Sequence, residues 1–172
     1  MRRIIGRSVF VAAHYSQDEQ ERTEVTNVQD AGALAGDAQI AALLYRYARA
    51  VDTKDWELYR SVFTADAYID YSSAGATVGS RDEVIDWFAA NFGALPWSMH
   101  YITNIEVLAR GPETATVRAM FYNPMQLPGS TEVSACGGYY HHDLVLTGDG
   151  WRSRALREEN VWFTGRPTDS PG

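Results

Sequence analysis

The stretch IAALLYRYARAVDTKDW, residues 40–56, decides the fold, because an apolar helical stripe runs through it and ends on an acid. Its hydrophobic residues keep the i, i+3, i+4, i+7 spacing of one helix face: Ile40, Leu43, Leu44, Tyr47, Ala48 and Val51. Asp52 lies four positions after Ala48, which places its carboxylate at the edge of the buried stripe. Burying a carboxylate costs several kcal/mol unless it is paired, and the helix dipole disfavours negative charge at this end. Asp52 therefore either caps the following turn or serves as a paired, functional carboxylate.

The residues after this helix predict a short second helix and then a strand. Asp55 is placed to cap the helix, whose side chains form one apolar ridge. The ridge residues are Trp56, Tyr59 and Phe63. The stretch DAYIDYSS, residues 66–73, alternates apolar and polar side chains, as does a strand with one buried face. The inward positions of that strand are Ala67, Ile69 and Tyr71.

The second half of the chain predicts one more helix and a sheet. Ser80 and Glu83 have the spacing of a capping box, so a third helix begins there, with an apolar face on Val84, Trp87, Phe88 and Phe92. Four strands follow, separated by the turn sequences RGPE, LPGS and TGDG. Their ranges are 98–109, 113–126, 132–147 and 150–164. Three helices before a long antiparallel meander predict an α+β fold in which a curved sheet wraps around the helices.

Composition limits the classes of function. The 172 residues are 45% hydrophobic, enough for one domain with a substantial core. A formal charge of −7 argues against a broad basic surface for nucleic acid or for an anionic membrane. No segment reaches the roughly 18 apolar residues of a membrane helix. Cys136 is the only cysteine, so neither an internal disulfide nor a cysteine zinc site can form, which fits a reducing, cytoplasmic location.

The N-terminal residues show two sequence patterns that differ from the pattern of the domain. MRRIIGRSVFVAA, residues 1–13, has the basic start and apolar run of a secretory signal, but Arg7 interrupts the run. Residues 15–35 are polar without a sustained period, which is typical of a linker. We expect a partly disordered N-terminal extension over residues 1–35, one domain over residues 36–167, and a tail over residues 168–172.

Three segments carry a resemblance to a known family. They are ARAVDTKDWELYRSVFTADAYIDY from residue 48, SMHYITNIEV from residue 98, and GGYYHHDLVLTGDGW from residue 137. They resemble the nuclear-transport-factor-2-like superfamily in its SnoaL-like branch, with scytalone dehydratase, bile acid 7-alpha-dehydratase and hexachlorocyclohexane dehydrochlorinase. The resemblance implies a cone-shaped α+β barrel, with three N-terminal helices packed in a strongly curved antiparallel sheet. It says little about the substrate, because this scaffold hosts several chemistries and also plain binding modules.

The resemblance places three candidate catalytic residues. Asp52 falls on the family's dyad aspartate and His100 on its dyad histidine. A carboxylate that accepts from one imidazole nitrogen fixes the tautomer, so the other nitrogen can remove a proton from carbon. Tyr47, five positions before Asp52, is expected to polarise a carbonyl or assist a leaving group. Taken singly, Asp52 also fits a helix-end cap, His100 a satisfied core histidine and Tyr47 the apolar stripe.

Further residues are expected to bind the substrate: Tyr71, Trp87, Phe121, Asn123 and His141. Asn123 falls near the position of an acid in the bile acid enzyme, and an amide can orient a carbonyl but cannot act as a base. Adjacent strand residues point to opposite faces, so His141 and His142 make poor joint metal ligands. We expect one of them to face the pocket, and the alternative is a surface or interface histidine. Met125 takes the place of the second histidine of scytalone dehydratase, so the chemistry differs in detail from that enzyme.

The sequence thus predicts a lyase or isomerase that needs no cofactor and no metal. Its dyad would act as the general base on an apolar, cyclic small molecule. The alternative is a non-catalytic binding or assembly module of the same fold. Bulky residues on both faces of residues 133–147 predict that a homodimer or homotrimer covers the outer face of the sheet.

Overall fold

The computed structural model describes residues 16–165, apart from the side chains of residues 18, 23 and 27–31. These residues fall into two units that divide between Gly36 and Asp37. The secretory-like pattern of residues 1–13 and the expected tail of residues 168–172 lie outside the described residues.

The first helix begins well before the apolar stripe. Helix α1 spans Gln17–Asp52, so the part of the expected extension or linker from Gln17 onward is helical. Ser16 caps the helix: its Oγ accepts from the Glu19 N–H at 3.3 Å, and Glu19 Oε2 accepts from the Ser16 N–H at 3.0 Å. Residues 17–31 are rich in good helix formers but are polar all round, so they show no apolar period for a sequence reading to detect.

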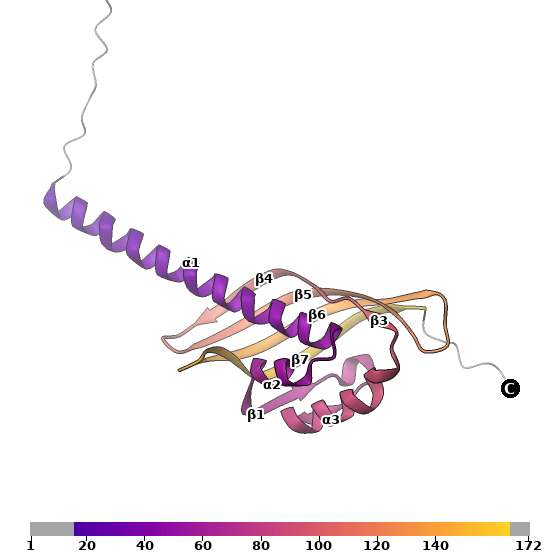
Figure 1. Ribbon diagram of the computed structural model, residues 1–172. Coiled ribbons are helices and arrows are strands. Elements are labelled where there is room, and N and C mark those ends of the chain that lie inside the picture. The colour runs from indigo at the N-terminus through magenta and orange to yellow at the C-terminus, as the bar shows by residue number, and fades with distance from the viewer. Residues whose placement is uncertain (1–15, 166–172) are drawn as a thin grey trace, which may run out of the picture. The chain divides into compact units, whose positions relative to one another are not determined.

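The unit from Asp37 onward is a curved sheet with helices on one face (Figure 1). The described strands form one sheet in the order β2-β1-β7-β6-β5-β3, and β4 also pairs with β5. Strand β1 runs parallel to β7, whereas the other pairs are antiparallel. The element bounds are α2 (Trp56–Val62), β1 (Phe63–Asp70), β2 (Val78–Ser80), α3 (Arg81–Asn91), β3 (Trp97–Ser98), β4 (Tyr101–Arg110), β5 (Thr114–Gln126), β6 (Val133–Thr147) and β7 (Gly150–Thr164).

The expected elements are largely confirmed. Asp55 Oδ1 accepts from the Leu58 N–H at 2.9 Å at the start of α2, and the capping box of Ser80 and Glu83 begins α3. The strand expected over residues 98–109 is instead two strands, β3 and β4, separated at Met99 and His100. The α+β fold with a strongly curved sheet is therefore observed as expected, with one interruption beside a candidate site residue.

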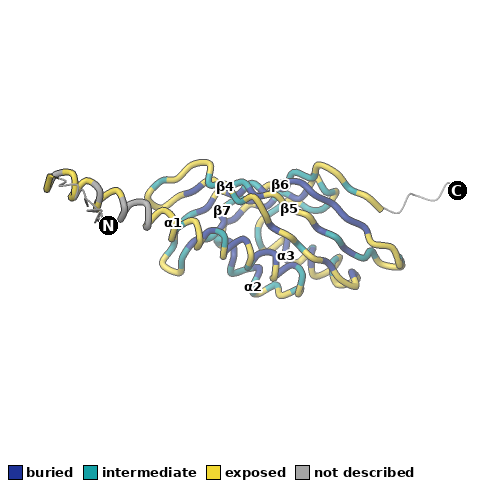
Figure 2. The backbone as a smooth tube through the Cα atoms, turned by 90° about the horizontal axis from the view of Figure 1, so that it is seen from above, coloured by how far each residue is buried: buried dark blue, intermediate teal, exposed yellow. Residues whose placement is uncertain are grey.

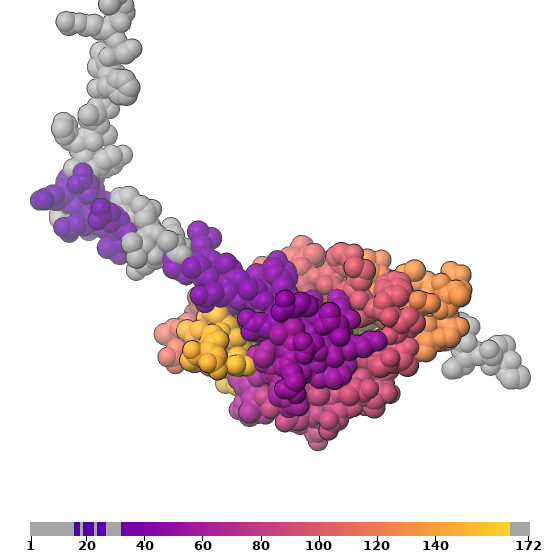
Figure 3. Space-filling model, in the orientation of Figure 1, coloured from indigo at the N-terminus to yellow at the C-terminus, as the bar shows by residue number. Residues whose placement is uncertain are grey.

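The core lies between the sheet and the helices. Every member of the predicted stripe on α1 is buried, from Ile40 to Val51, and the dark blue residues in Figure 2 concentrate in the sheet and the helices below it. On the helical face, α2 and the last turns of α1 adjoin the segment after α3 (Figure 3). Lys54 Nζ donates to the Leu95 carbonyl at 2.6 Å and ties these segments together. No described helix is long and apolar enough to cross a membrane.

Truncating the stripe should destabilise the fold. Leu44 is 1% exposed, so Leu44→Ala leaves a cavity and should lower the free energy of unfolding by about 2–5 kcal/mol. Urea denaturation followed by circular dichroism measures the change. Leu34→Ala on the same helix is the matched control, because Leu34 is 69% exposed and its truncation should change stability by less than about 0.5 kcal/mol. Equal losses in the two variants would contradict the assignment of the core.

Candidate active site

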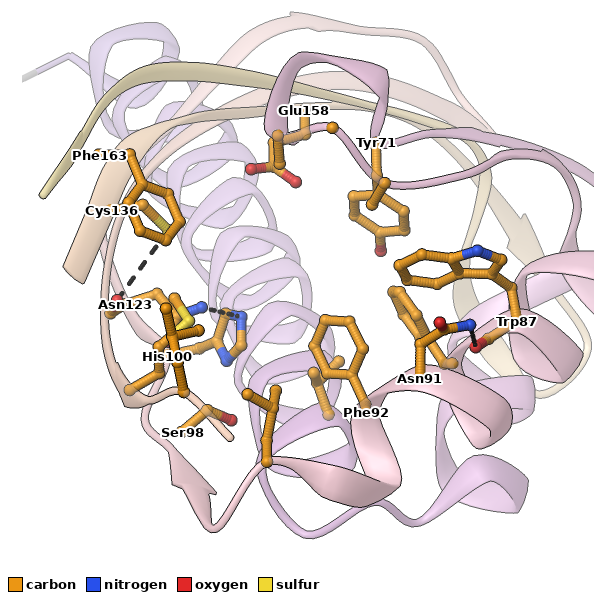
Figure 4. Close-up of a pocket in the computed structure, with 18 of the residues that line it drawn as sticks. Tyr71, Trp87, Asn91, Phe92, Ser98, His100, Asn123, Cys136, Glu158 and Phe163 are labelled. Carbon is orange, nitrogen blue, oxygen red and sulfur yellow. Dashed lines mark hydrogen bonds between the residues drawn. The ribbon is translucent and has the colours of Figure 1, made fainter. Parts of the chain in front are cut away.

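A cavity of about 260 Å³ opens between the curved sheet and the helices of the second unit (Figure 4). Aromatic and aliphatic side chains make most of its wall, including Trp87, Phe88 and Phe92 from α3 and the turn after it. Polar groups reach it from several elements: Tyr47, Tyr71, Ser98, His100, Asn123, Tyr140 and Glu158. A mostly apolar cavity with a few convergent polar groups is the usual form of a small-molecule site.

Asp52 and His100 meet beside this cavity. His100 Nδ1 lies 2.6 Å from Asp52 Oδ1, and the His100 backbone N–H donates to Asp52 Oδ2 at 2.8 Å. Ser98 Oγ donates to Oδ1 at 3.0 Å. An ionised carboxylate can only accept, so Nδ1 carries a proton, and Nε2 holds the lone pair when the ring is neutral. His100 lines the cavity and its side chain is only 4% exposed, so the carboxylate fixes a nearly buried imidazole.

The break between β3 and β4 explains why His100 is available. Its N–H is used by Asp52 instead of a neighbouring strand, and Pro124 on the facing strand β5 has no N–H to offer. The Met99 N–H donates to the Pro124 carbonyl at 3.0 Å. The sequence signals for this geometry are therefore an acid at a helix end and a proline inside a strand.

Asn123 holds the second nitrogen of His100. Its Nδ2 lies 3.0 Å from His100 Nε2, and it donates there when Nε2 carries the lone pair. Asn123 Oδ1 is buried without a hydrogen-bond partner among the described groups. The amide faces the cavity, as the strand parity of Asn123 predicted, and its free oxygen could accept from Nε2 if the ring took up a proton and the amide turned over.

Three tyrosine hydroxyls form a buried cluster. Tyr71 Oη lies 3.0 Å from Tyr47 Oη and 2.9 Å from Tyr59 Oη. Tyr47 also forms a side-chain hydrogen bond with Tyr140, so three hydrogen bonds use three of the four hydroxyl protons and one proton remains for another acceptor. Burial raises the pKa of all three phenols above the usual value, so they stay protonated and neutral. Tyr47 and Tyr71 line the cavity, where both were predicted to act.

Glu158 is a site residue that sequence reasoning missed. It lies on β7, is 7% exposed, and lines the cavity. Burial is the main cause that raises the pKa of this carboxyl to about 7, and the charge of Asp70 adds to the effect. The hydrogen bond from Asn160 acts in the opposite direction. The available signal was its position two residues after Leu156, which puts an acid on the buried face of the strand.

Two residues expected to bind the substrate do not line the cavity. Phe121 is buried but does not line the cavity, because its ring stacks on Tyr140 at 4.4 Å and Tyr140 takes the place at the wall. His141 points away from the cavity and lies 2.8 Å from Glu159 Oε2, since its strand position faces outward. Trp87 does line the cavity, as predicted.

His142 does not face the cavity either. It is buried in the core, where its Nδ1 lies 3.0 Å from Ser153 Oγ, and Ser153 donates to the Ala155 carbonyl. Burial lowers the pKa of His142 to about 3, so the ring is neutral at physiological pH. The expectation that one of the two adjacent histidines reaches the pocket is therefore wrong. Among the described residues there is no group of three His, Cys, Asp or Glu side chains that could hold a metal ion.

Comparison with known proteins identifies the family and the fold. Residues 32–157 match the family of SnoaL-like domains. An uncharacterised protein of Mycobacterium tuberculosis is 36% identical over 115 residues, which cover 66% of this chain and 78% of the relative. A solved protein from Kribbella flavida is 27% identical, with a TM-score of 0.70 over 77% of this chain and 95% of its own. A hexachlorocyclohexane dehydrochlorinase from Novosphingobium barchaimii shares the fold at 17% identity, with a TM-score of 0.69 over 80% and 94% of the two chains.

The raised pKa of Glu158 should make stability depend on pH. The folded state binds this proton more tightly than the unfolded chain, so the free energy of unfolding should fall as pH rises from about 4.5 to about 7. The loss should be roughly 2–3 kcal/mol, and Glu158→Gln should remove it. Urea denaturation at pH 5 and pH 8 measures the difference. Glu113→Gln, in an exposed turn, is the control, and an unchanged pH dependence in Glu158→Gln would contradict the assignment.

Proposed function

Since the chain belongs to the SnoaL-like family, we propose that it is a cofactor-independent lyase or isomerase acting on an apolar, cyclic small molecule. The observation that carries the proposal is the contact of 2.6 Å between His100 Nδ1 and Asp52 Oδ1 at the wall of the cavity. A dehydrochlorinase, which is a lyase by its name, is among the proteins of similar structure and supports this proposal. The dyad supplies the argument for this chain, since the fold alone does not specify an activity.

His100 is the general base in this proposal. Asp52 accepts from Nδ1–H, which holds the tautomer with the Nε2 lone pair toward the cavity and stabilises the imidazolium that forms. Without substrate, Asn123 Nδ2 donates to His100 Nε2. A C–H group of the bound substrate replaces this contact. The freed amide then orients the substrate carbonyl, and on proton transfer its oxygen can accept from Nε2–H.

The tyrosine cluster is the electrophile. Removing a proton next to a carbonyl leaves negative charge on the carbonyl oxygen, and a positioned donor stabilises that charge. The one hydroxyl proton not used within the network of Tyr47, Tyr59, Tyr71 and Tyr140 is available for this bond. Because burial keeps these phenols protonated, they donate hydrogen bonds and do not compete with His100 as bases.

The wall of the cavity selects the shape of the substrate. Trp87, Phe88 and Phe92 form adjoining aromatic contacts, with Phe88 and Phe92 ring centroids 4.6 Å apart. Flat aromatic surfaces in a cavity of about 260 Å³ suit a compact ring system better than a long chain. A cyclic ketone combines such a ring with the carbonyl that the mechanism requires.

Hydrogen exchange on a simple ketone tests the base. The folded protein should accelerate exchange of the α-hydrogens of cyclohexanone in D₂O, followed by proton NMR. His100→Ala and Asp52→Asn should each lower the rate by roughly 10²- to 10⁴-fold, since each disables the positioned base. His141→Ala is the matched control, because that histidine lies on the outer face. Equal exchange by wild type and His100→Ala would refute the catalytic role and favour the binding module.

We also propose that a second copy of the chain covers the outer face of the sheet. Tyr101, Tyr122 and Trp162 form an exposed aromatic row, with neighbouring ring centroids 5.9 and 6.0 Å apart. Trp162 lies over Gly137, where a Cβ would come within 2.7 Å of the indole, so the backbone leaves room for this ring. Contiguous exposed aromatic surface of this kind is typical of an interface.

Charge placed in the aromatic row should break the assembly. Wild type is expected to sediment as a dimer or trimer at micromolar concentration, and Tyr122→Glu with Trp162→Glu should give a monomer of unchanged helix content. Tyr45→Glu is the control, because Tyr45 is similarly exposed on α1. Sedimentation velocity gives the mass, and a monomeric wild type would contradict the proposal.

A further inference from the structure

Glu158 is a buried carboxyl at the cavity wall that the proposed base mechanism does not use. It comes from β7, and Figure 4 shows its carboxyl directed into the cavity at a separate part of the wall from His100. A catalytic base and a separate, unassigned acid that face one cavity are suited to removing one proton and delivering another.

The contacts of Glu158 are those of a neutral acid. Asn160 Nδ2 lies 3.4 Å from Oε1, and no Lys, Arg or His side chain forms an ion pair with Glu158 among the described residues. Its strand neighbours Arg157 and Glu159 pair with each other at 3.8 Å on the other face. A buried carboxylate without a cation is costly, so the protonated form is favoured.

The groups that surround Glu158 do not supply positive charge. Asp70 on β1 disfavours a second carboxylate nearby, while Tyr47 on α1, Tyr71 after β1 and Tyr140 on β6 are held as neutral phenols by burial. His100, which also lines the cavity, is already paired with Asp52. A pKa of about 7 leaves a useful fraction of protonated Glu158 at neutral pH.

We propose that Glu158 is the general acid of this site and that it protonates the hydroxyl leaving group of a dehydration. This inference rests on the proposed function of His100 as the base, and it adds the residue that protonates the leaving group.

The step balances in protons and electrons. His100 Nε2 takes a proton from the α-carbon, and the electrons of that C–H bond form a new C=C bond conjugated with the carbonyl. The C–O bond at the β-carbon breaks with its electron pair on oxygen, and the Glu158 proton passes to that oxygen to give water. The site is left with imidazolium and carboxylate, and proton exchange with solvent restores both groups.

The lining of the cavity favours hydroxide over an anionic leaving group. Halides and carboxylates leave as stable anions, which a cation in the site would stabilise, whereas a hydroxyl group needs a proton. The described residues that line the cavity include no Lys or Arg. The described wall therefore offers an acid to a departing hydroxyl group and no Lys or Arg side chain to a departing anion.

A matched pair of substrates tests the role of Glu158. Elimination from 3-hydroxycyclohexanone and from 3-acetoxycyclohexanone gives the same product, cyclohex-2-enone, which is followed by ultraviolet absorbance. Only the first needs a protonated leaving group. Glu158→Gln should lower kcat/KM for the hydroxy compound by roughly 10²-fold or more, and for the acetoxy compound by less than about tenfold. His100→Ala should lower both, and the outward-facing Glu159→Gln should lower neither.

The remaining outcomes separate this inference from the proposed function. Equal losses on both compounds in Glu158→Gln would make Glu158 structural and overturn the inference. If wild type exchanges cyclohexanone hydrogens but converts neither compound, the base stands and the dehydration is overturned. If it does neither, the proposed function fails as well.

Infrared spectroscopy tests the protonation state without any substrate. The wild-type minus Glu158→Gln difference spectrum at pH 6 should contain the carbonyl stretch of a protonated carboxylic acid, and this band should be lost by pH 9. Carboxylate bands at both pH values would overturn the acid role whatever the substrate.

Discussion

The site depends on the hydrogen bonds of the partly buried Asp52 carboxylate. Asp52 ends α1, where the helix dipole opposes a negative charge, yet it accepts hydrogen bonds from Ser98 Oγ, the His100 backbone and the His100 ring. Those bonds offset the cost of burial and fix the segment between β3 and β4 to the end of the helix. The same bonds interrupt the edge of the sheet, so His100 turns its second nitrogen toward the cavity. The end of α1, the break between β3 and β4, and the proposed base His100 therefore form one local structure.

The proposed base and the proposed acid differ in their surroundings. His100 has the Asp52 carboxylate beside it, whereas among the described residues no cation pairs with Glu158, so its neutral form is favoured. The cavity tyrosines Tyr47 and Tyr71 remain neutral donors. Asn123 completes the base side, because an amide can serve either protonation state of the imidazole by presenting its nitrogen or its oxygen.

The sequence predicted those features that follow from a regular period or from the family resemblance. The stripe on α1, both helix caps and the meander are periodic or carry capping signals, and Asp52 and His100 came together although they are 48 positions apart. Parity could not tell which inward ring reaches the cavity, so Phe121 was chosen where Tyr140 lies in front of it. The strand register gave the wrong face of the sheet for His141. Glu158 was missed because an acid in a strand normally marks the face exposed to solvent. The polar start of α1 had no period to read.

The places where local rules are broken gather at the cavity. An acid ends a helix at Asp52, and within residues 16–165 the buried amide oxygen of Asn123 has no hydrogen-bond partner and the buried Glu158 has no cation beside it. Each arrangement costs stability, and a chain selected only for a well-packed core would replace these groups with apolar ones. The His142 Nε2 atom is unpaired as well, but it lies in the core away from the cavity and has no such arrangement around it. These costly groups come from three different elements, α1, β5 and β7, and they meet at one cavity. This is the physical reason to propose that the cavity is an active site.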